Sequence, residues 1–226
     1  MARLGKPGYL TWKGPRDVTS EAALEVQEAI TATLLAEFPD AAVFAEEGPE
    51  DAPIPVDAEH LWIVDPICGS LNYVQGIPHF AVSIALRTAG TIRVGVVYNP
   101  CTGELFEATT ESPAKLNGRK IFVRHALEGV EAWDAAMVGT DWPRAGQRRD
   151  QARKIVGLML DQVNEISLMG SPALGLCNVA AGRLHAYWHL DLKIWDIAAN
   201  TVIHGWLLQC VQAVLNLSRS QSGSTS

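Results

Sequence analysis

The stretch Trp62-Ile-Val-Asp-Pro-Ile-Cys-Gly-Ser-Leu-Asn-Tyr73 is the most informative part of the chain. Its apolar start, Leu61–Val64, predicts a buried strand that ends at Asp65. The pair Gly69-Ser70 then predicts the start of a short helix. A carboxylate at a strand end, next to backbone N–H groups at a helix start, can collect a divalent cation and a phosphate together. Asp65 is therefore a candidate metal ligand, and Gly69 and Ser70 are candidate phosphate-binding residues.

Two further acidic positions support a metal site. Glu46-Glu47 follows a strand expected over residues 41–45, and Asp196 follows Trp195 where an apolar helix begins. Each position also has a simpler interpretation. An Asp-Pro pair often starts a turn, Glu46 could lie on the surface, and Asp196 could be a helix N-cap.

The composition indicates an ordinary globular protein without affinity for polyanions. The chain has 226 residues, of which 48% are hydrophobic and 19% charged, enough for one large domain or two small subdomains. Its net charge of −7 provides no attraction to nucleic acid, and no stretch interleaves basic with aromatic residues. A small phosphorylated substrate is compatible with this charge, because a metal and a few N–H groups can hold one phosphate.

The cysteines and apolar segments bear on the compartment. The 4 cysteines are widely spaced without a C-x-x-C pair, which argues against a zinc cage or a disulfide framework and favours a reducing cytosol. The first residues lack the apolar core of a secretion signal, and the apolar segment 206–217 is too short to span a bilayer. We therefore expect a cytoplasmic protein with no membrane attachment. Segment 206–217 is expected to form an amphipathic helix that packs on the core or on a second subunit, and we expect a homodimer.

The hydrophobic pattern predicts helices and strands in two groups. We expect a subdomain boundary near residues 124–132, which gives an N-terminal subdomain over 1–128, a C-terminal one over 129–217 and a disordered Ser-rich tail over 218–226. The predicted elements are a helix over 20–38, strands over 41–45, 61–64, 80–87, 92–98 and 104–108, and then a strand over 136–139, a helix over 148–162, a strand over 165–169 and a helix over 172–181.

Several motifs together resemble the inositol monophosphatase family in order and spacing. They cover roughly residues 13–200 and are F-A-E-E-G at 44–48, the stretch at 62–73, G-V-V-Y-N-P-C-T-G-E-L-F at 95–106, L-N-G-R-K-I at 116–121 and W-D-I-A-A at 195–199. The resemblance implies an α/β fold, an α+β layered sandwich in which helix and sheet layers alternate.

The resemblance also implies a chemistry and a set of site residues. Glu46, Asp65 and the backbone carbonyl of Ile67 would hold one Mg²⁺ that positions the attacking water, and Asp65 would share a second with Asp196. Mn²⁺ is an alternative cofactor. In this scheme the catalytic residues are Glu46 and Ser70, and the substrate-binding residues are Cys68, Gly69, Ser70 and His189.

Three positions depart from the family pattern. Cys68 stands where the family has an Asp, and is either an inert small residue or a ligand for a softer metal such as Mn²⁺ or Zn²⁺. Ala23 replaces an Asp that would activate water together with the hydroxyl of Ser70, unless Glu21, Glu25 or Glu47 compensates. His189 replaces a Glu that contacts a sugar hydroxyl in many inositol-specific members.

These features lead to one leading function and one alternative. The leading function is a Mg²⁺-dependent phosphomonoesterase acting on a small phosphorylated polyol or sugar, with inositol phosphate first and fructose bisphosphate or a nucleotide 3′-phosphate next. The alternative is a catalytically weakened or inactive family member, a pseudoenzyme that binds phosphate or a partner.

Overall fold

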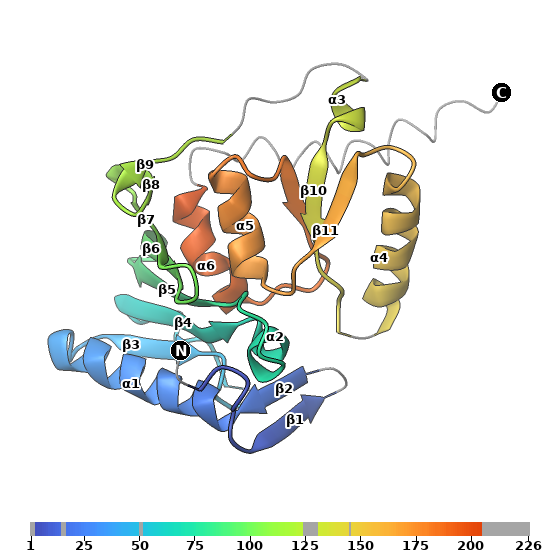
Figure 1. The fold of residues 1–226 in the computed structure, drawn as a ribbon. Helices are drawn as coiled ribbons and strands as arrows, with labels where there is room; N and C mark the ends of the chain where they lie inside the picture. Colours follow the sequence, from blue (N-terminus) through green and yellow to red (C-terminus); the bar gives the residue numbers. More distant parts are fainter. Residues whose placement is uncertain (1–2, 15–16, 50–51, 124–130, 145, 205–226) are drawn as a thin grey trace.

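The computed structural model describes residues 3–14, 17–49, 52–123, 131–144 and 146–204 (Figure 1). The elements before residue 124 are β1 (Leu10–Gly14), β2 (Asp17–Ser20), α1 (Glu21–Glu37), β3 (Ala42–Ala45), β4 (His60–Cys68), α2 (Ser70–Val74), β5 (Ala81–Thr88), β6 (Thr91–Asn99), β7 (Glu104–Thr109), β8 (Ser112–Leu116) and β9 (Arg119–Lys120). Those after it are α3 (Glu131–Asp134), β10 (Met137–Thr140), α4 (Gly146–Met159), β11 (Glu165–Leu168), α5 (Pro172–Ala180), β12 (Ala186–Trp188) and α6 (Ile194–Ile203).

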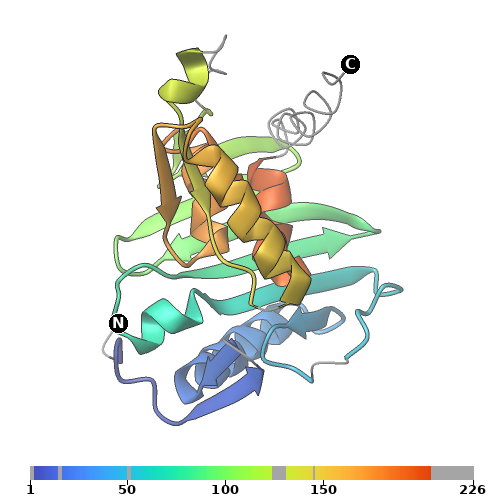
Figure 2. The same cartoon turned by 90° about the vertical axis from the view of Figure 1, so that its right-hand side faces the viewer.

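Sheets and helices alternate in layers. A 7-stranded sheet runs in the order β3-β4-β5-β6-β7-β8-β9, and a 3-stranded parallel sheet runs in the order β11-β10-β12. Helices α5 and α6 lie between the two sheets, while α4 covers the outer side of the smaller sheet and α1 packs beside β4 (Figures 1 and 2). This alternation confirms the predicted layered α/β fold.

The two faces of β4 explain why it is apolar along its length. Leu61 and Ile63 belong to the main core, which α5 and α6 complete, and both are almost fully buried. Trp62 points to the opposite face, because successive side chains alternate along a strand, and its ring centroid lies 5.4 Å from that of Phe38 at the end of α1. A strand that is covered on both faces has a continuous apolar sequence, without the alternation of polar and apolar residues seen in half-exposed strands.

Helix α6 lies directly on the larger sheet at a glycine. A Cβ built on Gly95 in β6 would lie 2.1 Å from the backbone oxygen of Ala199 in α6, a distance that no real side chain tolerates. Glycine at this position therefore sets how closely α6 approaches the sheet. The same helix carries Asp196 in its first turn.

The predicted elements are found with shifts of a few residues at their ends, with one correction that concerns the site. Strand β4 does not end at Asp65 but continues to Cys68, and its pairing with β5 shifts register between these two residues. The ribbon β1-β2, strands β8, β9 and β12, and the short helix α3 were not predicted. The expected boundary falls largely on residues 124–130, outside the described ranges, as do segment 206–217 and the tail 218–226. Among the residues that the structure describes, no helix is both long and apolar enough to cross a membrane.

Candidate active site

Acidic side chains from three segments converge where the larger sheet meets α6. Asp65 on β4, Cys68 at the end of the same strand and Asp196 on α6 each offer one ligand atom, and these atoms all lie within 4.8 Å of one another. Glu46 joins them because β3 runs parallel to β4 with Ala45 opposite Val64, and the Glu46 N–H donates to the Val64 carbonyl at 3.1 Å. The structure thus brings together all three carboxylates that the sequence predicted as metal ligands.

Asp65 is the most buried member of the group, with 1% of its surface exposed. It lies where β4 loses its regular register, and its Oδ1 accepts the Ile67 N–H at 3.1 Å. Burial raises the pKa of the Asp65 carboxyl well above its ordinary value, and the neighbouring Glu46 and Asp196 carboxylates raise it further. Without a cation between them, these groups therefore retain protons more readily than exposed carboxylates do.

Asp196 stabilises the first turn of α6 from the third helical position and also faces the site. Its Oδ2 accepts the Lys193 N–H at 2.7 Å, and Lys193 rather than Asp196 is the N-cap residue. Burial raises the pKa of Asp196 to about 6, and the Glu46 carboxylate contributes to the increase. The pKa of Glu46 is also raised, chiefly by burial. The capping interaction and a ligand role are compatible, because the carboxylate has a second oxygen.

Cys68 occupies a fixed position beside the carboxylates. It is 2% exposed, and its Sγ accepts the Ala173 N–H at 3.3 Å, while the Ser171 hydroxyl donates to its carbonyl at 2.8 Å. Burial raises the pKa of the Cys68 thiol well above its usual range, followed by the charges of Asp65 and Asp196. The first turn of α5 therefore holds both ends of this residue.

The turn after Cys68 depends on a glycine. Gly69 has a φ of 107°, and a Cβ there would lie 3.0 Å from the Gly170 carbonyl oxygen. Ser70 then opens α2, and its hydroxyl donates to the Ile67 carbonyl at 3.1 Å. The carbonyl and hydroxyl that the sequence analysis singled out are thus in direct contact.

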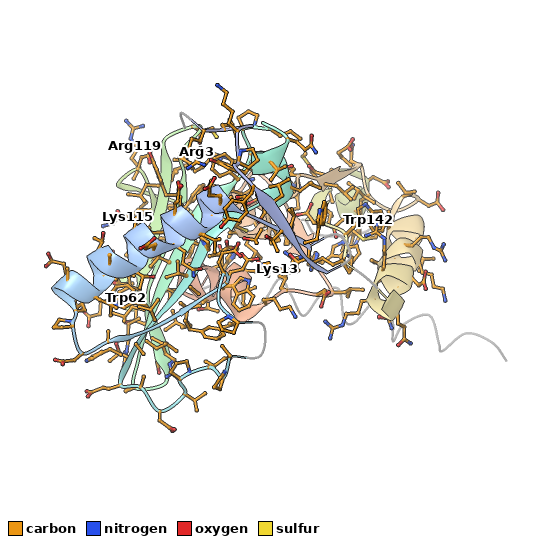
Figure 3. The ribbon with its side chains drawn as sticks, turned by 90° about the horizontal axis from the view of Figure 1, so that it is seen from below. Arg3, Lys13, Trp62, Lys115, Arg119 and Trp142 are labelled. Carbon is orange, nitrogen blue, oxygen red and sulfur yellow. The ribbon has the colours of Figure 1, made fainter. Side chains whose placement is uncertain are left out.

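Two cations that sequence reasoning missed balance the acidic group. Lys13 on β1 places its Nζ 2.9 Å from Glu47 Oε2 and 3.7 Å from Glu46 Oε1. Arg144, after β10, places its Nη2 3.6 Å from Glu46 Oε1 and its Nη1 2.5 Å from Asp17 Oδ2. Figure 3 shows Lys13 near the middle of the molecule, seen from below. No local pattern marks either residue, because both meet the site only through tertiary contacts.

The comparisons with known proteins agree with this arrangement. Residues 7–204 match the sequence model described as the Inositol monophosphatase family. The chain is 39% identical over 195 residues to an inositol-1-monophosphatase of Rhizobium meliloti, a match that covers 84% of this chain and 70% of the relative. It is 37% identical to the Nus factor SuhB of Vibrio cholerae, covering 85% of this chain and 70% of that protein. The crystal structure of the extragenic suppressor protein suhB of Bartonella henselae superposes with a TM-score of 0.79 at 34% identity, over 86% of this chain and 73% of that one.

The chain belongs to the inositol monophosphatase family. This is a phosphatase family, so the convergence of carboxylates is in keeping with its chemistry. The oxygen atoms of Glu46, Asp65 and the Ile67 carbonyl are hard donors, of the kind that would suit Mg²⁺. The set formed by Asp65, Asp196 and Cys68 does not fit it equally well, because sulfur is a soft donor.

The carboxylate that the family has at position 23 is not replaced by a neighbour on α1. Ala23 is 1% exposed, and it packs in a small core cluster with Ile67 and Tyr73, close to the turn that carries Ser70. The side chains of Glu21 and Glu25 instead pair with Arg3, on the surface. Of the three candidates for compensation, only Glu47 is buried near the site, and it pairs with Lys13.

His189 lies just after β12, and Arg144, which contacts Glu46, is close enough to affect its charge state. Its Nδ1 accepts the Asp191 N–H at 3.0 Å. Burial lowers the pKa of His189, and a backbone hydrogen bond with Trp142 and the charge of Asp191 offset only part of this effect. A neutral imidazole here can donate to or accept from a substrate hydroxyl but cannot neutralise a charge.

Proposed function

We propose that this chain is a metal-dependent phosphomonoesterase that hydrolyses a small phosphorylated polyol or sugar, with inositol phosphate as the first candidate. One observation carries the proposal. Glu46, Asp65 and Asp196 come from three separate segments, yet they meet in one buried group beside the Gly69-Ser70 turn. Because the chain belongs to a phosphatase family, we interpret this group as the site of phosphate ester hydrolysis.

The acidic residues would bind the cations. Glu46, Asp65 and the Ile67 carbonyl would hold Mg²⁺, or Mn²⁺ in its place, and Asp65 and Asp196 would bind the second cation. When bound, the metal supplies an activated water and neutralises charge on the phosphate. Glu46 orients its ligand oxygen from a buried position, since its side chain is 6% exposed.

The turn and the second half of the chain would hold the substrate. Gly69 and Ser70 offer backbone N–H groups to the phosphate, and the Ser70 hydroxyl, already bonded to the Ile67 carbonyl, is placed to orient the attacking water. His189 would contact a hydroxyl of the alcohol portion. Fructose bisphosphate and a nucleotide 3′-phosphate are the next substrates to test, because His189 replaces the residue associated with inositol.

A second candidate function is binding without efficient turnover. Cys68 and Ala23 favour it, since each stands where a catalytic carboxylate is expected and only Glu47 lies near enough to compensate. At about 2.7–4 kcal/mol of lost transition-state stabilisation each, such changes lower a rate by factors of about a hundred to a thousand. Some relatives are also named as Nus factors rather than as phosphatases.

The same proposal includes the compartment, the oligomeric state and the partners of the enzyme. We place it in the cytoplasm as a homodimer that acts on small molecules and not on nucleic acid or membranes. The net charge of −7 argues against nucleic acid as a partner, and the free thiols of Cys68 and Cys177 are in keeping with a reducing cytoplasm.

The test is phosphate release from inositol monophosphates, fructose 1,6-bisphosphate and 3′-phosphoadenosine 5′-phosphate, with Mg²⁺ or Mn²⁺. We expect wild-type turnover that is lost in Asp65→Asn and retained in Asp150→Asn, a matched change of an exposed aspartate on α4. Absence of wild-type turnover, together with partial recovery in a Cys68→Asp, Ala23→Asp double variant, would instead establish the binding alternative.

A further inference from the structure

The second donor set of the site contains a sulfur atom in a position to bind metal. Cys68 Sγ and one carboxylate oxygen each from Asp65 and Asp196 lie within 4.8 Å of one another. In a tetrahedral zinc site with one sulfur and two oxygen ligands, these atoms are about 3.4–3.6 Å apart. The three atoms lie up to 4.8 Å apart, so zinc binding requires them to move closer together. Three protein ligands with one open position are the usual arrangement of a catalytic zinc site.

Each of the three ligands is oriented by one backbone N–H group. The Ile67 N–H donates to Asp65 Oδ1 at 3.1 Å, the Lys193 N–H to Asp196 Oδ2 at 2.7 Å, and the Ala173 N–H to Cys68 Sγ at 3.3 Å. Such outer contacts fix the direction of a metal ligand and leave its remaining lone pairs available. The Ala173 N–H lies in the first turn of α5, where it has no acceptor within the helix, and it fixes the direction of Cys68 Sγ.

The donor set determines which cation fits. Mg²⁺ requires oxygen donors in a near-octahedral arrangement and keeps several waters, so a thiolate is a poor exchange for a carboxylate. Zn²⁺ accepts sulfur and carboxylate oxygen together in a tetrahedral arrangement. The oxygen set of Glu46, Asp65 and the Ile67 carbonyl keeps its fit to a hard cation, and the two sets share Asp65.

We propose that Asp65, Cys68 and Asp196 form a thiolate-containing site that selects Zn²⁺ over Mg²⁺, so that the centre holds one hard and one borderline cation. The inference rests on the metal centre of the proposed function but not on turnover. It follows that Cys68→Asp converts the site formed with Asp65 and Asp196 into one that binds Mg²⁺.

Co²⁺ titration of the full-length, metal-free protein under a phosphine reductant tests this proposal, because cobalt bound to a thiolate has a sulfur-to-metal charge-transfer band in the near ultraviolet. We expect the band in the wild type, its loss in Cys68→Ser and its retention in Cys177→Ser. Cys177 is a matched control, since it is equally buried and its Sγ bonds to Asn200 Oδ1, a contact that a serine hydroxyl can keep. Zn²⁺ should abolish the band at equimolar amounts, while Mg²⁺ in large excess should not.

Competition with a chromophoric chelator gives a second, independent reading. Zn²⁺ affinity should fall at least about tenfold in Cys68→Ser, and Cys68→Asp should gain Mg²⁺ affinity while losing the cobalt band. Absence of the band in the wild type, or its survival in Cys68→Ser, would overturn the proposal. Phosphate release measured on the same samples separates the two ideas: turnover without the band refutes only the thiolate site, and the band without turnover refutes only the phosphatase.

Discussion

At the scale of single residues, the site contains more buried negative charge than its basic side chains neutralise, and a bound cation would neutralise the rest. Burial raises the pKa of all three carboxyls, Glu46 and Asp196 raise that of Asp65 further, and Glu46 contributes to that of Asp196. Lys13 and Arg144 offset part of this negative charge from the Glu46 side. Buried like charges are costly, and protons or cations are the two ways to relieve them. Both routes can be tested by changing one group at a time.

The stability of the metal-free protein should decrease as pH rises from about 4 to about 7. The folded-state pKa of Asp196 is about 6, above the ordinary value of 3.8, so the folded protein binds more protons than the unfolded chain in this interval. Its stability is therefore greatest below the unfolded pKa and is lost as pH rises through the folded one. We expect about 1–3 kcal/mol of this dependence to disappear in Asp196→Asn. Urea unfolding with a chelator, at several pH values, measures it. Asp150→Asn should keep the wild-type slope, and an unchanged slope in Asp196→Asn would contradict the assignment.

Lys13 should act as an internal competitor of the metal. Its Nζ contacts both Glu46 and Glu47, so Lys13→Gln leaves two buried carboxylates without this partner. We expect the metal-free protein to lose about 1.5–3 kcal/mol of stability and the affinity for Mg²⁺ to rise. Calorimetric titration and urea unfolding check the two effects. Lys120→Gln, a change of an exposed lysine on β9, is the control. A lower Mg²⁺ affinity in Lys13→Gln would show that the lysine assists the cation.

At the scale of elements, the parts that the sequence predicted are those encoded locally. Helix α1 follows its apolar spacing from the Ser20 N-cap, whose hydroxyl accepts the Ala23 N–H at 3.2 Å. The carboxylates were recognised because motifs precede or contain them. Strand β12 has only 3 residues, too few for a period to register, and the β1-β2 ribbon is defined by its pairing. The contacts of Lys13 and Arg144 with Glu46 join distant segments, which no window along the sequence can detect.

The close packing of α6 on β6 at Gly95 should affect cation binding, although Gly95 is not itself a ligand. Gly95→Ala places a methyl group where the Ala199 carbonyl now lies, so α6 must move away from the sheet and take Asp196 with it. We expect a loss of about 1–3 kcal/mol in stability and weaker cation binding at Asp196. Gly90→Ala is the comparison, because a Cβ at Gly90, in the β5–β6 turn, meets nothing within 4 Å. Its positive φ of 79° gives it a backbone cost of its own, so a stability loss common to both variants is expected. Cation affinity should fall only in Gly95→Ala, and equal affinities would show that α6 tolerates the shift.

At the scale of the whole molecule, the metal centre ties together parts of the chain that are far apart in sequence. Glu46 and Asp65 belong to the larger sheet, Asp196 belongs to the helical layer above it, and Arg144 reaches Glu46 from the segment after β10. A cation shared by Asp65 and Asp196 can bind only when the larger sheet and α6 are assembled. Binding energy at the site is therefore folding energy of the whole protein.

The melting temperature should accordingly rise with cation concentration, even in variants that do not turn over. At a hundred times the dissociation constant, one site contributes about 2.7 kcal/mol, because the unfolded chain does not present the assembled ligands. Thermal unfolding at increasing Mg²⁺, with a chelator as the starting point, measures the effect. Asp65→Asn should remove most of the Mg²⁺ shift, since this carboxylate belongs to the oxygen donor set with Glu46 and the Ile67 carbonyl, while Asp196→Asn should retain most of it. Asp150→Asn should behave as the wild type. Equal shifts in all four proteins would place the Mg²⁺ outside the buried carboxylates, because a cation held by them must depend on Asp65.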